Sequence, residues 1–158
     1  MEGHAKINTF EAMKLDPVTK PIYQEMVDSS GDPITCEQVW ISYFTGGRDN
    51  MGEGYGKLTA GYGSRRVPSE MGEKIGPEFT FGIYAQKALK EPILIIKTAW
   101  GGKSIHTDFR PPSAGPYVIN ENELENFKRR GKDIERIKME KVEQTGKFYG
   151  LMIDHVKK

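Results

Sequence analysis

The feature that most constrains the fold is a continuous apolar run from Ile93 to Ile96, which follows a segment with helical spacing. Gly76-Pro77-Glu78 opens that segment, with a proline suited to the first helical position and an acidic side chain suited to the positive end of the helix dipole. The apolar run is typical of a strand that is covered on both faces. A helix followed by a buried strand is half of a parallel βαβ unit, so the sequence predicts an α/β fold.

The first half of the chain predicts few further elements. Residues 1–35 are polar and interrupted by prolines and glycines, so we expect a loop with one short helical turn. Residues 39–44 are β-branched and aromatic, which predicts a strand. The glycine-rich run 46–56 predicts a turn or exposed loop, and residues 57–63 predict a second, weaker strand.

The C-terminal part is charged and carries an apolar stripe. Residues 120–147 predict an amphipathic helix that Gly131 is placed to break, and residues 148–156 continue the pattern. Three strands are few for a doubly wound sheet, which usually has about five or six. We therefore expect a single domain that is unfinished at both ends.

The composition disfavours several classes of partner. The chain has 158 residues, 37% of them hydrophobic, and 23 basic against 22 acidic side chains give a net charge of +1. Such a balance supplies no large field of one sign for nucleic acid or an anionic membrane surface. We expect no membrane span and no secretory signal at the N-terminus. Cys36 is the one cysteine, and no Cys or His pairs have zinc-ligand spacing, so we expect no metal and no cofactor.

Motifs for nucleotides and nucleophiles do not fit well. A phosphate loop ending in Gly102-Lys103-Ser104 needs a glycine where Lys97 stands, and the glycines of residues 52–56 do not match the dinucleotide fingerprint. Ser104 lacks the Gly-x-Ser-x-Gly pattern, so a polar loop residue is favoured over a nucleophile. Cys36 is interpreted as a packed or partly exposed thiol.

Three positions are better candidates for a site. His4 and His106 lie in predicted loops near glycines, where side chains can approach a ligand, whereas His155 is expected on a helix. Gly76 precedes a helix, and a glycine there offers an unobstructed backbone N–H at the positive end of the dipole, as an oxyanion hole requires. An ordinary helix start is the alternative interpretation of Gly76.

Three strings of the sequence together resemble a known family. They are Ile-Gly-Pro-Glu-Phe at 75–79, Leu-Ile-Ile-Lys-Thr-Ala-Trp-Gly-Gly-Lys-Ser at 94–104, and Asp-Phe-Arg-Pro-Pro-Ser at 108–113. In combination they resemble the sialate O-acetylesterase and acetylxylan esterase branch of the SGNH hydrolases, over most of the chain. Members of that branch carry a Gly-Gln-Ser-Asn-Met segment whose serine is the nucleophile. The start of this chain, Met1-Glu2-Gly3, is similar to the continuation of that segment.

The resemblance implies both a fold and a function. The fold is a partial three-layer α/β/α sheet of the flavodoxin-like type, missing its first strand and its C-terminal part, with residues 1–158 as a partial esterase domain. The implied function is a carbohydrate O-acetylesterase acting on sugars such as sialic acid or xylan. The nucleophile is expected two positions before Met1 and the Asp-x-x-His segment beyond Lys158; Asp154-His155 has the wrong spacing to replace it. Gly76, as an oxyanion donor, is the one catalytic role carried over.

The expected substrate is an acetylated carbohydrate. Residues that follow a buried strand lie at the carboxyl edge of a sheet, where ligand sites of α/β proteins are found. We therefore expect a substrate-binding set consisting of Trp100, Gly101, Gly102, Lys103, His106, Arg110 and His4. The full-length relatives that the resemblance implies are expected to be secreted or periplasmic, while the localisation and oligomeric state of this chain stay open. The alternative is a noncatalytic carbohydrate-binding or structural remnant whose apolar edges a partner covers.

Overall fold

The computed structural model describes residues 2–47 and 49–158. The chain divides into two compact units, Met1–Gly101 and Gly102–Lys158. Each unit is described by itself. The class is mixed α/β, as expected, with three hydrogen-bonded strands in the main sheet of the first unit.

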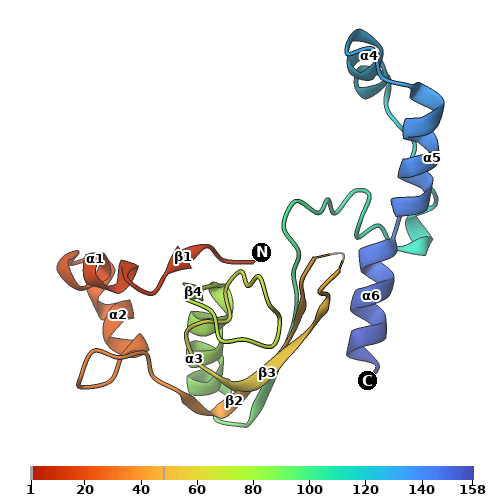
Figure 1. Ribbon diagram of the computed structural model, residues 1–158. Coiled ribbons are helices and arrows are strands. Elements are labelled where there is room, and N and C mark those ends of the chain that lie inside the picture. Colours follow the sequence, from red (N-terminus) through yellow and green to blue (C-terminus); the bar gives the residue numbers. More distant parts are fainter. Residues whose placement is uncertain (1, 48) are drawn as a thin grey trace. The chain divides into compact units, whose positions relative to one another are not determined.

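The main sheet contains the parallel pair that the sequence predicts. Strands β2 (Cys36–Thr45) and β5 (Ile93–Thr98) run parallel, and helix α3 (Pro77–Leu89) precedes β5. The sheet order is β3-β2-β5, and β3 (Gly52–Leu58) is antiparallel to β2 (Figure 1). The sheet of the described residues is therefore mixed rather than wholly parallel.

Strand β3 overturns the expectation of a loop for residues 52–56, whereas residues 46, 47 and 49–51 lie outside any strand or helix, and residue 48 is outside the described residues. In its register Tyr43 lies opposite Gly54, and a Cβ added at Gly54 would overlap the carbonyl oxygen of Pro68 and the Arg65 guanidinium. A glycine within a strand often marks a place where another part of the chain approaches the backbone closely. Gly54 is such a glycine, and it does not prevent β3 from pairing with β2. The expected strand 57–63 is wrong beyond Leu58, where β3 ends.

The N-terminal segment is more regular than its composition predicts. A short strand β1 (Ala5–Lys6) pairs with β4 (Lys74–Ile75), and two helices follow β1, α1 (Thr9–Leu15) and α2 (Lys20–Met26). Phe10 of α1 meets Tyr23 of α2 edge to face, with ring centroids 5.9 Å apart. Both rings are buried in the core, which explains why the expected loop with one helical turn is wrong here: packing stabilises helices that are too short to form alone.

The core of the first unit lies on one face of the sheet. Val39 and Ile41 of β2 pack with Phe79 and Ile83 of α3, and all four are buried. The opposite face carries Leu94 and Ile96, which no element of the first unit buries: they are 62% and 40% exposed. Within the first unit, this strand is therefore covered on one face, where the sequence predicts cover on both.

The second unit is helical, as the sequence indicates. The expected amphipathic helix is divided into α4 (Glu121–Arg129) and α5 (Ile134–Gln144), with Gly131 between them at a φ of 63°. Helix α6 (Lys147–Val156) follows, and a short 3₁₀ turn, η1 (Pro112–Ala114), precedes all three. Across residues 2–47 and 49–158, none of the helices has the length and hydrophobicity needed to cross a bilayer.

Candidate functional site

The carboxyl end of β5 brings the N-terminal residues of the chain to the edge of the sheet. The Lys97 side chain donates a hydrogen bond to the carbonyl oxygen of Glu2 at 2.8 Å. A Cβ added at Gly101 would lie 2.9 Å from a carboxylate oxygen of Glu2. On β2, the Thr45 hydroxyl donates to the carbonyl oxygen of Ala99 at 2.7 Å, which ties the ends of the two parallel strands together.

A buried ion pair lies at the centre of this edge. Lys97 Nζ is 2.8 Å from Glu78 Oε2, and the two side chains are only 7% and 4% exposed. The ammonium also donates to the carbonyl oxygen of Tyr62 at 2.6 Å. With Glu2, these partners use all three N–H donors of the lysine. Burial lowers the pKa of Lys97, and the Glu78 carboxylate opposes that shift.

Gly76 is the residue that immediately precedes α3, where the sequence predicts an oxyanion donor. Its backbone N–H donates to Glu78 Oε1 at 3.1 Å, so in this structure the N–H is already engaged. A Cβ added at Gly76 would overlap the Glu78 carboxylate, and a Cβ added at Gly3 would overlap the Gly76 backbone. The two glycines therefore let three segments meet: residues 2–4, the start of α3 and the end of β5.

Aromatic rings and a second cation enclose the ion pair. Lys97 Nζ lies 4.3 Å from the centroid of the Tyr43 ring, and the Arg65 guanidinium lies 4.1 Å from that of Tyr62. Arg65 also donates to the carbonyl oxygens of Gly61 and Pro68. Cations over ring faces are stabilised by the ring quadrupole.

No sequence motif assigns a role to Glu2, Gly3 or the side chain of Lys97. One local signal is present: a lysine directly follows the apolar run from Ile93 to Ile96. A charge within a buried strand needs a partner, and this requirement predicts an ion pair without naming the partner.

Tyr43 supplies a test of the electrostatics of this interior. Its hydroxyl is buried and has no hydrogen-bond partner among the described residues, and burial raises the pKa of Tyr43 to about 12 from its ordinary value of 10.0. As pH rises, the Tyr43 hydroxyl loses its proton in the unfolded chain before it does so in the folded chain. The contribution of the neutral hydroxyl to the free energy of unfolding is therefore complete below pH 10 and is lost as pH rises toward 12. We expect Tyr43→Phe to leave the free energy of unfolding at pH 7 within about 1 kcal/mol and to reduce its alkaline loss by up to about 3 kcal/mol, measured by urea unfolding.

Tyr55→Phe is the matched control for that measurement, because Tyr55 is 80% exposed. It should leave the alkaline loss unchanged. Equal pH profiles for Tyr43→Phe and the unmodified chain would contradict the assignment of the loss to Tyr43.

The remaining expected residues of the first unit are Trp100 and His4. Trp100 is only 7% exposed and meets Phe44 edge to face at 5.4 Å, so its ring offers little surface to a sugar. His4 is exposed, with Nε2 3.4 Å from a Glu2 carboxylate oxygen and Nδ1 3.5 Å from Lys74 Nζ. Gly76 and Gly101 thus lie against the N-terminal segment, residues 2–4, to which His4 itself belongs.

The other four expected residues belong to the second unit and engage groups within it. Lys103 Nζ lies 4.5 Å from the ring centroid of Phe148, and the His106 ring meets Tyr117 edge to face at 5.0 Å. Arg110 donates to the carbonyl oxygens of Gly115 and Ala114 at 2.7 and 2.6 Å. Gly102 has a φ of 69°, a conformation that favours glycine.

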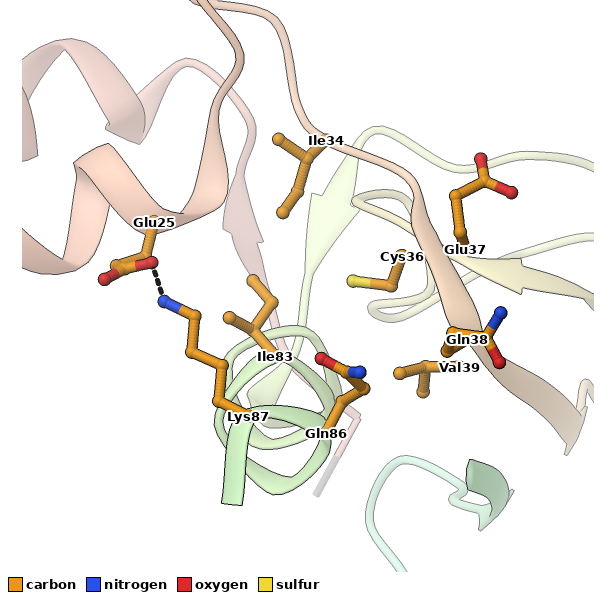
Figure 2. Close-up of a pocket in the computed structure, with 9 residues that line it drawn as sticks. All are labelled: Glu25, Ile34, Cys36, Glu37, Gln38, Val39, Ile83, Gln86 and Lys87. Atoms are coloured by element: carbon orange, nitrogen blue, oxygen red, sulfur yellow. Dashed lines mark hydrogen bonds and ion pairs between the residues drawn. The ribbon is translucent and has the colours of Figure 1, made fainter. Parts of the chain in front are cut away.

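Ser104 and Cys36 have the surroundings of structural residues. The Ser104 hydroxyl accepts from the backbone N–H of His106 at 3.0 Å, within a local turn. Cys36 lines a pocket of about 260 Å³ between α2, β2 and α3, whose wall includes the Lys87–Glu25 ion pair (Figure 2). Burial raises the pKa of the Cys36 thiol, which lowers its reactive thiolate fraction.

Among the residues that the structure describes, no three His, Cys, Asp or Glu side chains are grouped to hold a metal ion. Comparison of the chain with protein-family models, curated proteins and solved structures gives no significant match.

Proposed function

We propose that this chain is part of a carbohydrate O-acetylesterase of the SGNH type and that it supplies an oxyanion donor and part of the substrate wall. In this proposal the three-layer α/β/α sheet is completed by segments outside the chain, which also carry the catalytic Ser, Asp and His. The substrate is an acetylated carbohydrate such as acetylated xylan or sialic acid. Support comes from the three sequence strings that resemble this family.

The observation that carries the proposal is the contact between Gly3 and Gly76. A Cβ at Gly3 would overlap the Gly76 backbone, so the two segments approach as closely as backbones can. In the resemblance, Glu2 and Gly3 directly follow the nucleophile segment, and Gly76 donates to the oxyanion. An esterase needs these two groups within a few ångströms of each other, because the serine attacks the carbonyl whose oxygen the N–H holds.

The expected chemistry follows the usual order for serine esterases. The serine attacks the acetyl carbonyl, a histidine takes its proton, an aspartate orients the histidine, and backbone N–H groups hold the oxyanion. For Gly76 to take part, the Glu78 carboxylate has to release the Gly76 N–H, with which it is now hydrogen-bonded at 3.1 Å. Lys97 remains beside the carboxylate and neutralises its charge.

That hydrogen bond also favours the alternative function, a noncatalytic carbohydrate-binding or structural remnant. If Glu78 never leaves Gly76, the N–H cannot serve an acetyl oxygen. The nucleotide sequence before Met1 separates the two proposals. Codons for Gly-Gln-Ser-Asn in frame support the esterase, and a stop codon directly before Met1 supports the remnant.

A binding experiment tests the proposed site in the chain itself. The ¹⁵N-labelled chain is titrated with an O-acetylated xylo-oligosaccharide and with the same oligosaccharide after deacetylation. We expect the amide signals of Gly3, Gly76 and Gly101 to shift only with the acetylated ligand. Equal shifts with both ligands favour the noncatalytic binding protein, and unchanged signals with both contradict the proposed substrate.

The 158-residue chain should hydrolyse aryl acetates no faster than buffer, because the proposal assigns its nucleophile to a segment outside the chain. The measurement is a spectrophotometric assay over a range of chain concentrations. Saturable turnover that disappears in Ser104→Ala would make Ser104 a nucleophile after all. Turnover lost only in Cys36→Ala would point to a thiol mechanism.

A further inference from the structure

The ammonium of Lys97 connects three separate segments of the first unit. Its hydrogen bonds reach Glu78 in the first turn of α3, the carbonyl oxygen of Glu2 and the carbonyl oxygen of Tyr62. The Lys97 side chain of β5 therefore links this strand to the start of α3, to the loop at Tyr62 and to the N-terminal segment.

Gly3 is the point at which this network holds the N-terminal segment. Its φ of 81° is a left-handed conformation that favours glycine, and its carbonyl oxygen accepts from the Ser64 backbone N–H at 2.7 Å. Lys97 holds the carbonyl of the preceding residue, Glu2. The carbonyl oxygens of two consecutive residues, Glu2 and Gly3, are thus held by two different donors, the Lys97 ammonium and the Ser64 N–H. Together these hydrogen bonds set the direction of the backbone next to Gly76.

We infer that Lys97 is a positioning residue that fixes the Glu2–Gly3 backbone against the start of α3. A neutral, well-packed pair can replace a buried ion pair with little or no loss of stability, so stability alone does not require a lysine here. Only a group with several N–H donors can hold a carboxylate and two carbonyls at once. The catalytic meaning of this role rests on the proposed function, in which Glu2 and Gly3 follow the nucleophile.

The first test uses the unmodified chain. NMR of the labelled protein should show a slowly exchanging Lys97 ammonium signal with a nuclear Overhauser contact to the Gly3 α-protons. Amide hydrogen exchange should show Ser64 protected, since its N–H is bonded to Gly3. A rapidly exchanging ammonium without that contact would overturn the inference.

The second test separates positioning from simple charge balance. In Lys97→Met/Glu78→Gln the buried charges are removed together, so the fold is retained, but the donor to Glu2 is missing. We expect exchange at Ser64 to rise at least about tenfold relative to Ile34, since a hydrogen bond to a charged group contributes about 1.5–3 kcal/mol. The Ile34 amide, bonded to Met26 at 2.9 Å, is the internal reference because it lies outside the network.

Unchanged Ser64 protection in the double variant would show that Lys97 only balances Glu78. Glu78→Gln alone is the second variant: it lowers global stability, because Lys97 loses its buried carboxylate. It keeps the donor to Glu2, so the protection of Ser64 relative to Ile34 should stay unchanged. None of these measurements involves an ester. Failure of the inference is therefore distinguishable from failure of the proposed function, which the oligosaccharide titration reports.

Discussion

Replacing Lys97 with methionine should lower the free energy of unfolding by about 3–5 kcal/mol, the usual cost of removing one partner of a buried ion pair. The substitution leaves the Glu78 carboxylate, whose side chain is 4% exposed, without its cation. It also removes the donor to the carbonyl oxygens of Glu2 and Tyr62. Urea unfolding followed by circular dichroism measures the loss.

Two variants show whether this cost comes from the buried charge. Lys97→Met/Glu78→Gln should recover most of the lost stability, because the uncompensated carboxylate is gone. Lys57→Met is the matched control, since Lys57 forms an exposed ion pair with Glu37 and such pairs contribute less than about 1 kcal/mol. A loss for Lys97→Met no larger than that for Lys57→Met would contradict a stabilising role for the buried pair.

If the proposed esterase function holds, Gly76→Val in the chain joined to its proposed upstream and downstream segments should lower turnover by about 10² to 10³, the typical effect of losing one oxyanion donor. The backbone at Gly76 has a φ of −117° and a ψ of −179°, which valine adopts readily. The added side chain instead meets the Glu78 carboxylate and occupies the space beside the N–H. Turnover is measured together with the folded fraction.

The two roles of Gly76 predict different outcomes. If Gly76 only begins the helix, Gly76→Val reduces the folded fraction and leaves the rate of each folded molecule unchanged. Gly150→Ala is the matched control, because Gly150 lies within α6 and a Cβ there would meet no atom within 4 Å. An unchanged rate in well-folded Gly76→Val would remove the one catalytic role assigned to this chain.

Local signals predicted the elements on which the site is built. The proline at the first position of α3 and the apolar run of β5 identified both elements, and Gly131 marked the break between α4 and α5. These signals act within a few residues of one another, so the sequence displays them directly.

Elements that depend on distant contacts were missed. Strand β3 was missed because its glycines are typical of a loop. The reason for a glycine at position 54 is the close approach of Arg65 and Pro68, which local sequence does not display. Helices α1 and α2 have seven residues each, and their stability comes from core rings such as Phe10. Neither feature follows from local propensity.

The sequence by itself determined the helix before β5 and the parallel strand that follows it, and it contains a lysine within that strand. Only the tertiary structure decided that the partners are Glu78 and the carbonyl of Glu2, and that Glu78 already holds the N–H of Gly76. The physical reason is that propensity and periodicity act along the chain, whereas the pairing of a buried charge depends on which segments packing brings within hydrogen-bond distance.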